Sequence, residues 1–371
     1  MISVLFLIPT LDRGGAENVL VDLVNHMDQS KFQITVQTLF DQNSQKNRLR
    51  EGIEYRTFLY HQFHGNSRLM ARIPARLLYK LIVRKRYDVV ISYLEGPTSH
   101  IISGCPYKDT KRVAWFHSAL KSDRGFHAGF VSKKTAVKAY LNYDVVVFVA
   151  NTVKSTIEKT AGVSFHNAKV LYNTLNSEII IRGAEENVAG FPLSEEEFNI
   201  ISAGKIVSVK GYDRLAKVQK RLKTAGYRTH VYILGIGQDQ KKIEEYIDRN
   251  GLTESFTFLG FQKNPYKYIN KADLFVCSSR REGFSTAVSE ALILGIPVVS
   301  TNCSGAIELL GEHNEYGIVT ENNVKALYQG IKRMIDAPDL LEFYKKQSSL
   351  KGKSFSADRT VNEVERMILG I

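Results

Sequence analysis

Short apolar runs alternate with longer amphipathic stretches along most of the chain. The short runs are rich in β-branched and aromatic residues, which is typical of strands, whereas the longer stretches have the period of helices. This alternation predicts repeated βα units around parallel sheets. The predicted strands lie at about 2–8, 33–39, 88–92, 112–116, 144–149, 168–172, 198–203, 229–234, 256–259, 273–277 and 297–300.

The segment 183–197 divides this series of strands in two. It is polar and acidic and contains Gly190 and Pro192, so we interpret it as a linker. A chain of 371 residues also exceeds what one hydrophobic core usually organises. We therefore predict an α/β protein with two Rossmann-like, doubly wound domains facing each other across a cleft, where ligands are expected. The predicted parts are 1–185, 186–352 and a last helix at 353–371 that packs back toward the first domain.

Cysteines and apolar runs indicate the compartment. Cys105, Cys277 and Cys303 are too few and too scattered for a disulfide framework or a zinc site, which favours a reducing environment. The apolar start lacks a basic flank and runs into Pro9, so it is interpreted as a strand and not as a signal peptide. No apolar run approaches the roughly 20 residues that cross a bilayer. Any membrane contact is therefore expected to be peripheral.

A turn with two adjacent glycines, Gly14 and Gly15, follows the first predicted strand and opens a helix. Glycines let the backbone approach a ligand, and the free amides of a helix start favour anions. The spacing is not that of the dinucleotide fingerprint, which disfavours a dehydrogenase. The alternative is a tight turn that binds nothing.

The second domain opens with a similar turn in which Lys205 and Lys210 flank flexible backbone next to Gly204 and Gly211. Two cations in such a turn are suited to hold a diphosphate and to neutralise the charge that builds on it as a leaving group. A solvated basic loop is the alternative. Gly235 is a further, weaker phosphate-loop candidate.

The segment from Glu282 to Glu290 gives the strongest signal. Small residues precede a helix predicted at 287–294, so free amides can bind phosphate or a sugar hydroxyl, and both carboxylates can accept hydrogen bonds from a sugar. If both glutamates lay on one helix, they would be roughly 12 Å apart along its axis. The carboxylates of a glycosidase are about 5 to 9.5 Å apart, which disfavours a hydrolase.

Together these motifs resemble glycosyltransferase family 4 of the GT-B fold. The resemblance rests on the Glu282 to Glu290 pattern, the Gly14-Gly15-Ala-Glu and Gly204-Lys205 motifs with Lys210-Gly211, and Asn173, in family order. It implies a retaining, metal-independent enzyme that transfers a sugar from a nucleotide sugar, most often a UDP-sugar, to a glycan. The reaction would proceed at the front face without a covalent enzyme intermediate, and no permanently bound cofactor is expected.

The resemblance also implies roles for single residues. Lys205 and Lys210 would bind the donor diphosphate, although the family more often has arginine at the first position, and Glu290 would hold the ribose. His117, after the strand predicted at 112–116, would face the donor sugar, although a lone histidine is more often structural. The implied catalytic residues are His117, Lys205, Lys210 and Glu282. The implied donor-binding residues are Gly14, Gly15, Lys205, Lys210, Gly235, Gly283, Phe284, Ser285, Thr286 and Glu290.

No metal site is expected. The chain contains no Asp-x-Asp motif, so the metal-clamped diphosphate of the other major glycosyltransferase fold has no obvious ligands. His61 and His64 lack a third ligand and are interpreted as part of a loop.

A basic stretch from Arg68 to Arg86 suggests a membrane contact. Its cations recur every fourth residue, so on one helix they would form a continuous face next to a leucine-rich flank, with the regular helix starting at Pro74. Such an element can lie on an anionic leaflet. The alternative is that the leucines pack into the core while the cations are solvated. Residues that could extend this surface are Lys121, Arg124, Phe126, Phe130, Lys133, Lys134 and Lys138.

The net charge of +12 is concentrated in the first half, where residues 1–190 hold 25 Lys and Arg against 16 Asp and Glu. Such a field attracts phosphates, anionic lipid or nucleic acid. We expect no nucleic-acid partner, because single-strand binding needs aromatic platforms between the cations and the basic stretch offers leucines.

A nucleotide-sugar epimerase of related architecture is the closer enzymatic alternative. The family resemblance implies a lipid-linked glycan acceptor in bacterial surface polysaccharide or glycolipid synthesis. It also implies a cytoplasmic protein that is peripheral on the inner face of the cytoplasmic membrane.

Overall fold

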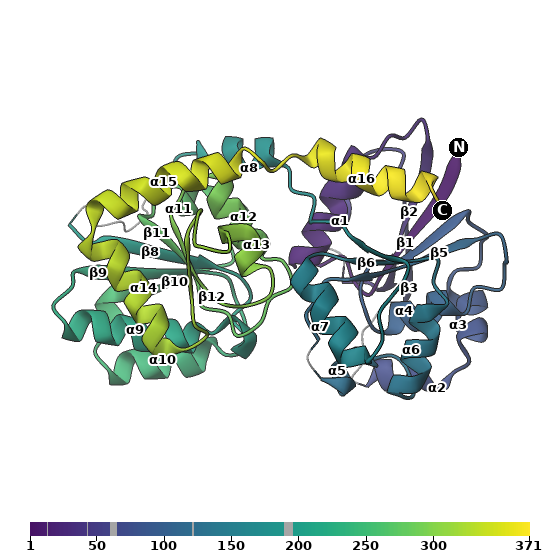
Figure 1. Ribbon diagram of the computed structural model, residues 1–371, viewed down its shortest axis with the longest axis horizontal. Coiled ribbons are helices and arrows are strands. Elements are labelled where there is room, and N and C mark those ends of the chain that lie inside the picture. The colour runs from purple at the N-terminus through teal and green to yellow at the C-terminus, as the bar shows by residue number, and fades with distance from the viewer. Residues whose placement is uncertain (13, 43, 60–64, 121, 189–195) are drawn as a thin grey trace. The chain divides into compact units, whose positions relative to one another are not determined.

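A computed structural model describes residues 1–12, 14–42, 44–59, 65–120, 122–188 and 196–371. Their contacts divide the chain into two compact units, 1–175 with 357–371 and 176–356. Both termini belong to the first unit (Figure 1). Five residues named in the sequence analysis lie outside the described part: His61, His64, Lys121, Gly190 and Pro192.

The first unit is built on a seven-stranded parallel sheet with the order β3-β2-β1-β4-β5-β6-β7. Its interior strand β1 is apolar and fully buried from Val4 to Ile8, because helices cover both faces. The strands are β1 (Ile2–Ile8), β2 (Phe32–Phe40), β3 (Glu54–Leu59), β4 (Val89–Ser92), β5 (Lys111–Phe116), β6 (Val145–Phe148) and β7 (Ala168–Val170).

One face of this sheet is covered by α1 (Gly15–His26) and α16 (Ala357–Leu369), which lie side by side (Figure 1). The carboxylate of Glu365 on α16 accepts a hydrogen bond from the backbone N–H of Asp28 at 2.7 Å, so the end of the chain is anchored in the first unit. The remaining helical segments of this unit are η1 (Lys46–Arg48), α2 (Asn66–Arg72), α3 (Ala75–Ile82), α4 (Pro97–Ser103), α5 (Asp123–Phe126), α6 (Lys133–Leu141) and α7 (Asn151–Ala161).

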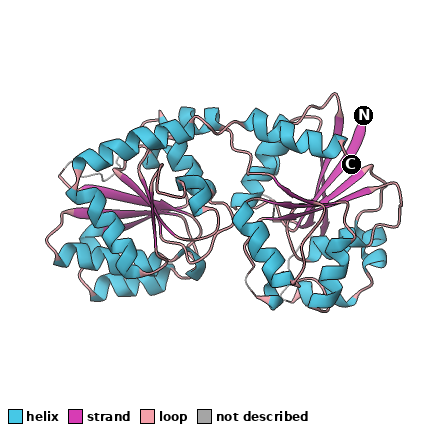
Figure 2. Ribbon diagram, in the orientation of Figure 1, coloured by secondary structure: helices cyan, strands magenta, loops and turns pink. Residues whose placement is uncertain are grey.

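The second unit has a six-stranded parallel sheet with the order β10-β9-β8-β11-β12-β13, again between layers of helices (Figure 2). Its strands are β8 (Phe198–Ala203), β9 (Thr229–Leu234), β10 (Phe256–Gly260), β11 (Leu274–Cys277), β12 (Val298–Thr301) and β13 (Ile318–Thr320). Its helical segments are α8 (Ser177–Ala184), η2 (Ser208–Lys210), α9 (Tyr212–Thr224), α10 (Gln240–Arg249), η3 (Thr253–Ser255), α11 (Tyr266–Ile269), α12 (Thr286–Ile293), α13 (Ala306–Leu310), α14 (Val324–Asp336) and α15 (Pro338–Gly352).

The predicted α/β class is confirmed, and every predicted strand is present with its ends within two residues of the prediction. Two strands were not predicted. β3 is an edge strand without a fully buried residue, so it lacks an apolar run, and β13 has only three residues.

Each sheet has a point where the strand order reverses direction, between β1 and β4 in the first unit and between β8 and β11 in the second. In doubly wound sheets, ligands bind beyond the carboxyl ends of the strands at this point. The loops that follow these strands are therefore the expected ligand-binding positions in each unit.

The basic stretch from Arg68 to Arg84 does not form one continuous cationic helix face, although a regular helix does begin directly after Pro74 as predicted. Ile73 is extended, with φ −87° and ψ 134°, because a residue that precedes proline avoids the helical region. The stretch therefore forms two helices, α2 and α3, and Arg84 lies beyond the end of α3. An added Cβ on Gly104 would overlap the backbone of Ala75, so this glycine lets the start of α3 pack closely on the end of α4.

Within the described residues, the helices are too short or too polar to cross a bilayer.

Candidate functional site

Two loops meet at the switch point of the second unit, one after β8 and one after β11. The backbone N–H of Arg280 donates to the carbonyl of Val209 at 2.7 Å, and the hydroxyl of Ser278 donates to the carbonyl of Lys210 at 2.9 Å. Gly211 has φ 71°, and an added Cβ there would overlap the carbonyl of Ser278. The turn that carries Lys205 and Lys210 (the lysine turn) and the turn that carries Glu282 (the glutamate turn) are therefore packed against each other and hydrogen-bonded.

An ion pair between Lys210 and Glu282 joins these two turns. The ammonium Nζ is 2.7 Å from the carboxylate Oε1, which also accepts a hydrogen bond of 2.5 Å from the hydroxyl of Ser279. The side chains are only 25% and 11% exposed, so the pair is largely out of water. Burial opposes the charged lysine, but the attraction of Glu282 outweighs it and raises the pKa of Lys210. Lys210 is therefore charged at neutral pH.

A second ion pair, between Arg280 and Asp213, also joins the two loops. Both guanidinium nitrogens Nη1 and Nη2 of Arg280 donate to the carboxylate of Asp213 at 2.7 Å, and Nη1 also donates to the carbonyl of Ser208. Burial tends to raise the pKa of Asp213, but the hydrogen bonds and charge of Arg280 lower it overall. A bidentate pair of this kind fixes orientation as well as charge, so Arg280 positions the loop that carries Lys210.

Lys205 differs from Lys210 in that its side chain is exposed. Within the described part of the chain it takes part in no ion pair, so its charge is available to a ligand. It follows Gly204, which has φ 147°. An added Cβ on Gly235 would overlap the carbonyl of Gly204, which gives a packing reason for that glycine independent of phosphate binding.

The turn before α12 carries the remaining predicted donor contacts. Phe284 and Ser285 are buried, and the hydroxyl of Ser285 caps the helix by accepting from the N–H of Val288. Because α12 begins at Thr286, Glu282 lies in the turn before it, as predicted, so the spacing calculated for two glutamates on one helix does not apply. The partly exposed Glu290 is on α12. The carboxylate of Glu282 is held by its hydrogen bond with Lys210.

The first unit places Gly14 and Gly15 at the start of α1, directly beyond β1. Gly14 precedes the helix in an extended conformation without a side-chain cap, and Gly15 is its first residue. The helix of 12 residues directs its first amides out of the carboxyl end of the sheet. This agrees with the predicted turn, and a helix start is suited to an anion.

His117 directly follows β5, next to the switch point of the first sheet. Its backbone N–H donates to the carboxylate of Glu95 at 2.9 Å, and its ring lies 4.7 Å from the ring of Tyr93. Burial lowers the pKa of His117 to about 3, so the imidazole is neutral at physiological pH. Its buried Nε2 atom has no hydrogen-bond partner among the described residues and can therefore serve a ligand hydroxyl.

Glu95 was not identified from the sequence. It follows β4, and burial raises the pKa of its carboxyl group against the opposing hydrogen bonds from His117 and Ser118. A charged residue between an apolar strand and the Gly96-Pro97 helix start is a local signal that could have revealed it. Arg280 and Asp213 were missed for another reason: their pairing joins residues 67 positions apart.

Among the described residues, no group of three or more His, Cys, Asp or Glu side chains could hold a metal ion.

Two family models match this chain in succession. The model described as Glycosyltransferase Family 4 matches residues 13–178, and the model described as Glycosyl transferases group 1 matches residues 184–350. Their matches together include the turn at Gly15, His117, the two lysines and the segment from Glu282 to Glu290.

Similar curated proteins come from bacteria and an archaeon. The chain is 32% identical over 210 residues to the N-acetylgalactosamine-N,N'-diacetylbacillosaminyl-diphospho-undecaprenol 4-alpha-N-acetylgalactosaminyltransferase of Campylobacter jejuni, covering 56% of this chain and 55% of that protein. It is 29% identical over 152 residues to the capsular polysaccharide biosynthesis glycosyltransferase CapM of Staphylococcus aureus, covering 40% of each. The chain thus matches about half the length of the first relatives.

Among solved structures, HepE of Anabaena in complex with UDP and glucose superposes with a TM-score of 0.81 at 18% identity, covering 100% of both chains. This likeness shows the fold.

Proposed function

This chain belongs to the glycosyltransferases of family 4 and group 1 and has the GT-B fold, and we propose that it transfers a sugar from a nucleotide sugar to a glycan. The observation that carries the proposal is the Lys210–Glu282 pair, which joins the two predicted donor motifs at the switch point of the second unit. The proposed donor is a UDP-hexose or a UDP-N-acetylhexosamine. It is supported by the similarity to HepE, whose structure holds UDP and glucose.

Each charged residue of the proposed donor site has its own proposed role. Lys205 and Lys210 hold the diphosphate and neutralise the charge that develops on it. Glu282 accepts hydrogen bonds from sugar hydroxyls with the lone pairs that Lys210 and Ser279 leave free. Glu290 holds the ribose, and the backbone from Gly283 to Thr286 contacts the diphosphate and the sugar.

The first unit is proposed to contribute the neutral ring of His117 to the donor sugar and the start of α1 at Gly14 and Gly15 to the diphosphate. A neutral imidazole can donate or accept a hydrogen bond without placing a second charge beside the reaction. Glu95 positions His117 by accepting a hydrogen bond from the backbone N–H of His117.

The proposed reaction retains the configuration of the sugar and needs no metal. The bond between the anomeric carbon and the diphosphate oxygen breaks on the face where the acceptor oxygen forms its bond. The leaving diphosphate takes the proton of the acceptor hydroxyl. The protein supplies orientation and charge stabilisation.

The proposed acceptor is a lipid-linked glycan of bacterial surface polysaccharide or glycolipid synthesis, used at the inner face of the cytoplasmic membrane. The name of the Campylobacter relative contains a diphospho-undecaprenol acceptor. The structure adds a suitable surface, because Leu69, Leu77 and Leu81 are each at least 50% exposed among the cations of α2 and α3. Exposed leucines beside cations are what an interfacial element needs.

A panel of nucleotide sugars tests the proposed function. We expect purified protein to bind one UDP-sugar and to transfer its sugar to a lipid-linked glycan with retention, measured by mass spectrometry and NMR, in the presence of a metal chelator. Isomerisation of the nucleotide sugar without any acceptor would identify an epimerase and overturn the proposal.

Reversing the charges of Arg72, Arg76 and Lys80 to Glu is expected to weaken binding to phosphatidylglycerol vesicles at low salt by at least about 100-fold. Each cation near an anionic surface contributes about 1 kcal/mol, so three lost cations account for this factor before any repulsion. All three side chains are exposed, so the fold should be unchanged. Vesicle co-sedimentation measures the effect.

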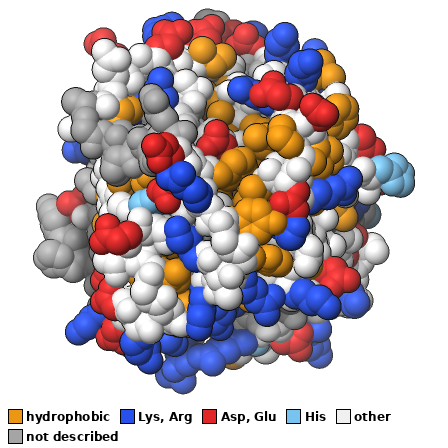
Figure 3. Space-filling view, turned by 90° about the vertical axis from the view of Figure 1, so that its left-hand side faces the viewer, with side chains coloured by type: hydrophobic (Ala, Val, Ile, Leu, Met, Phe, Trp, Pro, Cys, Tyr) orange, Lys and Arg blue, Asp and Glu red, His pale blue; other side chains and the backbone are white. Residues whose placement is uncertain are grey.

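The matched control reverses three exposed lysines of the second unit, Lys241, Lys242 and Lys263. The face in Figure 3 carries acidic and basic side chains interspersed, with Lys and Arg gathered at its lower edge, so cations are not confined to one unit. If the control lost as much vesicle binding as the test variant, net charge and not the α2–α3 surface would explain the attraction.

A further inference from the structure

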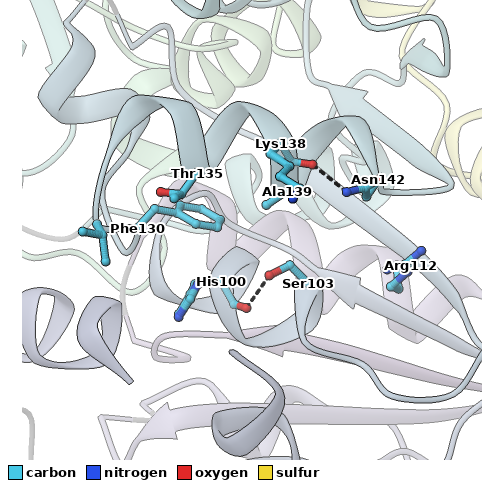
Figure 4. A pocket seen from close by; sticks show the side chains of 9 residues that line it. His100, Ser103, Arg112, Phe130, Thr135, Lys138, Ala139 and Asn142 are labelled. Carbon is cyan, nitrogen blue, oxygen red and sulfur yellow. Dashed lines mark hydrogen bonds between the residues drawn. The ribbon is translucent and has the colours of Figure 1, made fainter. Parts of the chain in front are cut away.

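A groove of about 460 Å³ lies between α4 and α6 in the first unit, apart from the residues proposed to hold the donor. His100 and Ser103 on α4 form one wall, and Thr135 and Lys138 on α6 form the opposite wall (Figure 4). Phe130 lies near one end of the groove, and Arg112 lies at the other. Its volume is within the usual range of about 300 to 1,000 Å³ for sites that bind small molecules.

The charge in this groove has one sign. Arg112 and Lys138 line it, and no acidic residue is among the described residues that do. Lys138 is exposed and makes no ion pair with another described residue. The ion pair of Arg112 with Asp144 is long, at 3.7 Å through Nε. The groove is therefore complementary to an anion.

One end of the groove is apolar. Val131, which lines it, is 68% exposed. The ring of Phe130 lies edge-on to His100 at 5.2 Å, which gives the same end of the groove an aromatic wall. A ligand with a phosphate and a short apolar portion would satisfy both the cations and this apolar end.

The groove is directly connected to the proposed membrane surface on α2 and α3. The ring atom Nε2 of His100 is 3.0 Å from the carbonyl of Ile73, at the break between these helices. The close packing of Gly104 on Ala75 joins the same two segments. A headgroup in the groove would thus lie next to the break between α2 and α3, the two helices that are proposed to contact the bilayer.

We propose that this groove binds the headgroup of one anionic phospholipid, with its phosphate at Lys138 and Arg112 and its acyl chains leaving over Val131. This proposal deepens the proposed membrane contact and rests on it. It differs from general attraction to a charged surface, because a groove binds one lipid molecule saturably. Lipid recognition here is separate from the donor and from the reacting acceptor group.

Dihexanoyl phosphatidylglycerol, dissolved as monomers, is the probe. We expect saturable binding with one site, measured by calorimetry and by NMR shifts of groove residues. Lys138→Glu should weaken it by at least about 10-fold, since a reversed charge beside the phosphate changes attraction to repulsion. Lys134→Glu is the matched control on the same helix, because Lys134 is exposed but does not line the groove. It should change the affinity by less than about twofold.

Two further arms identify the ligand. Dihexanoyl phosphatidylcholine and inorganic phosphate should each bind at least about 10-fold more weakly than the anionic lipid. Equal loss in the two lysine variants, absence of saturable binding, or equal affinity for phosphate alone would overturn the proposal. Sugar transfer is not part of the readout, so failure of the proposed enzymatic function would leave this result unchanged and distinguishable.

Discussion

The Glu282→Ala variant is expected to lose at least about 10³-fold in kcat/KM for sugar transfer, equivalent to about 4 kcal/mol of transition-state stabilisation. The substitution removes the carboxylate proposed to hold the donor sugar. It also leaves the ammonium of Lys210, only 25% exposed, without its ion-pair partner. Misplacement of the sugar and of the cation that faces the leaving diphosphate should then combine. Initial-rate kinetics with the preferred UDP-sugar measure the loss.

Folding and chemistry are separated by two additional variants. Glu282→Gln keeps the volume and one acceptor oxygen, so it should fold like the wild type and still lose most activity. Glu254→Ala removes an exposed carboxylate elsewhere in the same unit and should leave kcat/KM within about twofold. Circular dichroism and UDP binding check the fold. A Glu282→Ala enzyme with full activity would contradict the proposed donor site.

The Lys210→Ala variant is expected to lower kcat by about 10²- to 10³-fold, since removal of one group that stabilises developing charge typically has this effect. It should also lower the thermal midpoint of unfolding, because the Glu282 side chain, which is only 11% exposed, then loses its ion-pair partner. Steady-state kinetics and thermal unfolding give the two quantities.

Lys205→Ala distinguishes charge stabilisation from structural support. Its ammonium is exposed and makes no ion pair with another described residue, so kcat should fall while the thermal midpoint stays within about 1 °C. Lys263→Ala, at another exposed lysine of the unit, should change neither quantity. If both Lys205→Ala and Lys210→Ala changed only stability and left kcat intact, the proposal that these lysines hold the diphosphate would be wrong.

Much of the fold was predictable because burial leaves a local signature. A strand buried on both faces, such as β1 from Val4 to Ile8, must be a continuous apolar run, and a run of that length bounded by Pro9 is readable without a partner. The same logic explains the missed strand β3. Its pairing with β2 stabilises it at the sheet edge, although its own sequence contains Glu54 and Arg56.

The site was predictable only as separate motifs. The family resemblance identified the lysine turn and the glutamate turn as candidates, but it did not indicate that Lys210 and Glu282 bond to each other. These residues are 72 positions apart, and they meet because β8 and β11 are neighbours at the switch point. Glu95 and His117 meet for a similar reason across β4 and β5.

The sequence by itself therefore determined the α/β class, the positions of most strands and the family, since each depends on residues close together along the chain. The residue types between Glu282 and Glu290 by themselves indicated a nucleotide sugar. Only the tertiary structure decided the order of the strands and the partner of each charged side chain. Those features depend on contacts between distant segments, which local periodicity and spacing do not encode.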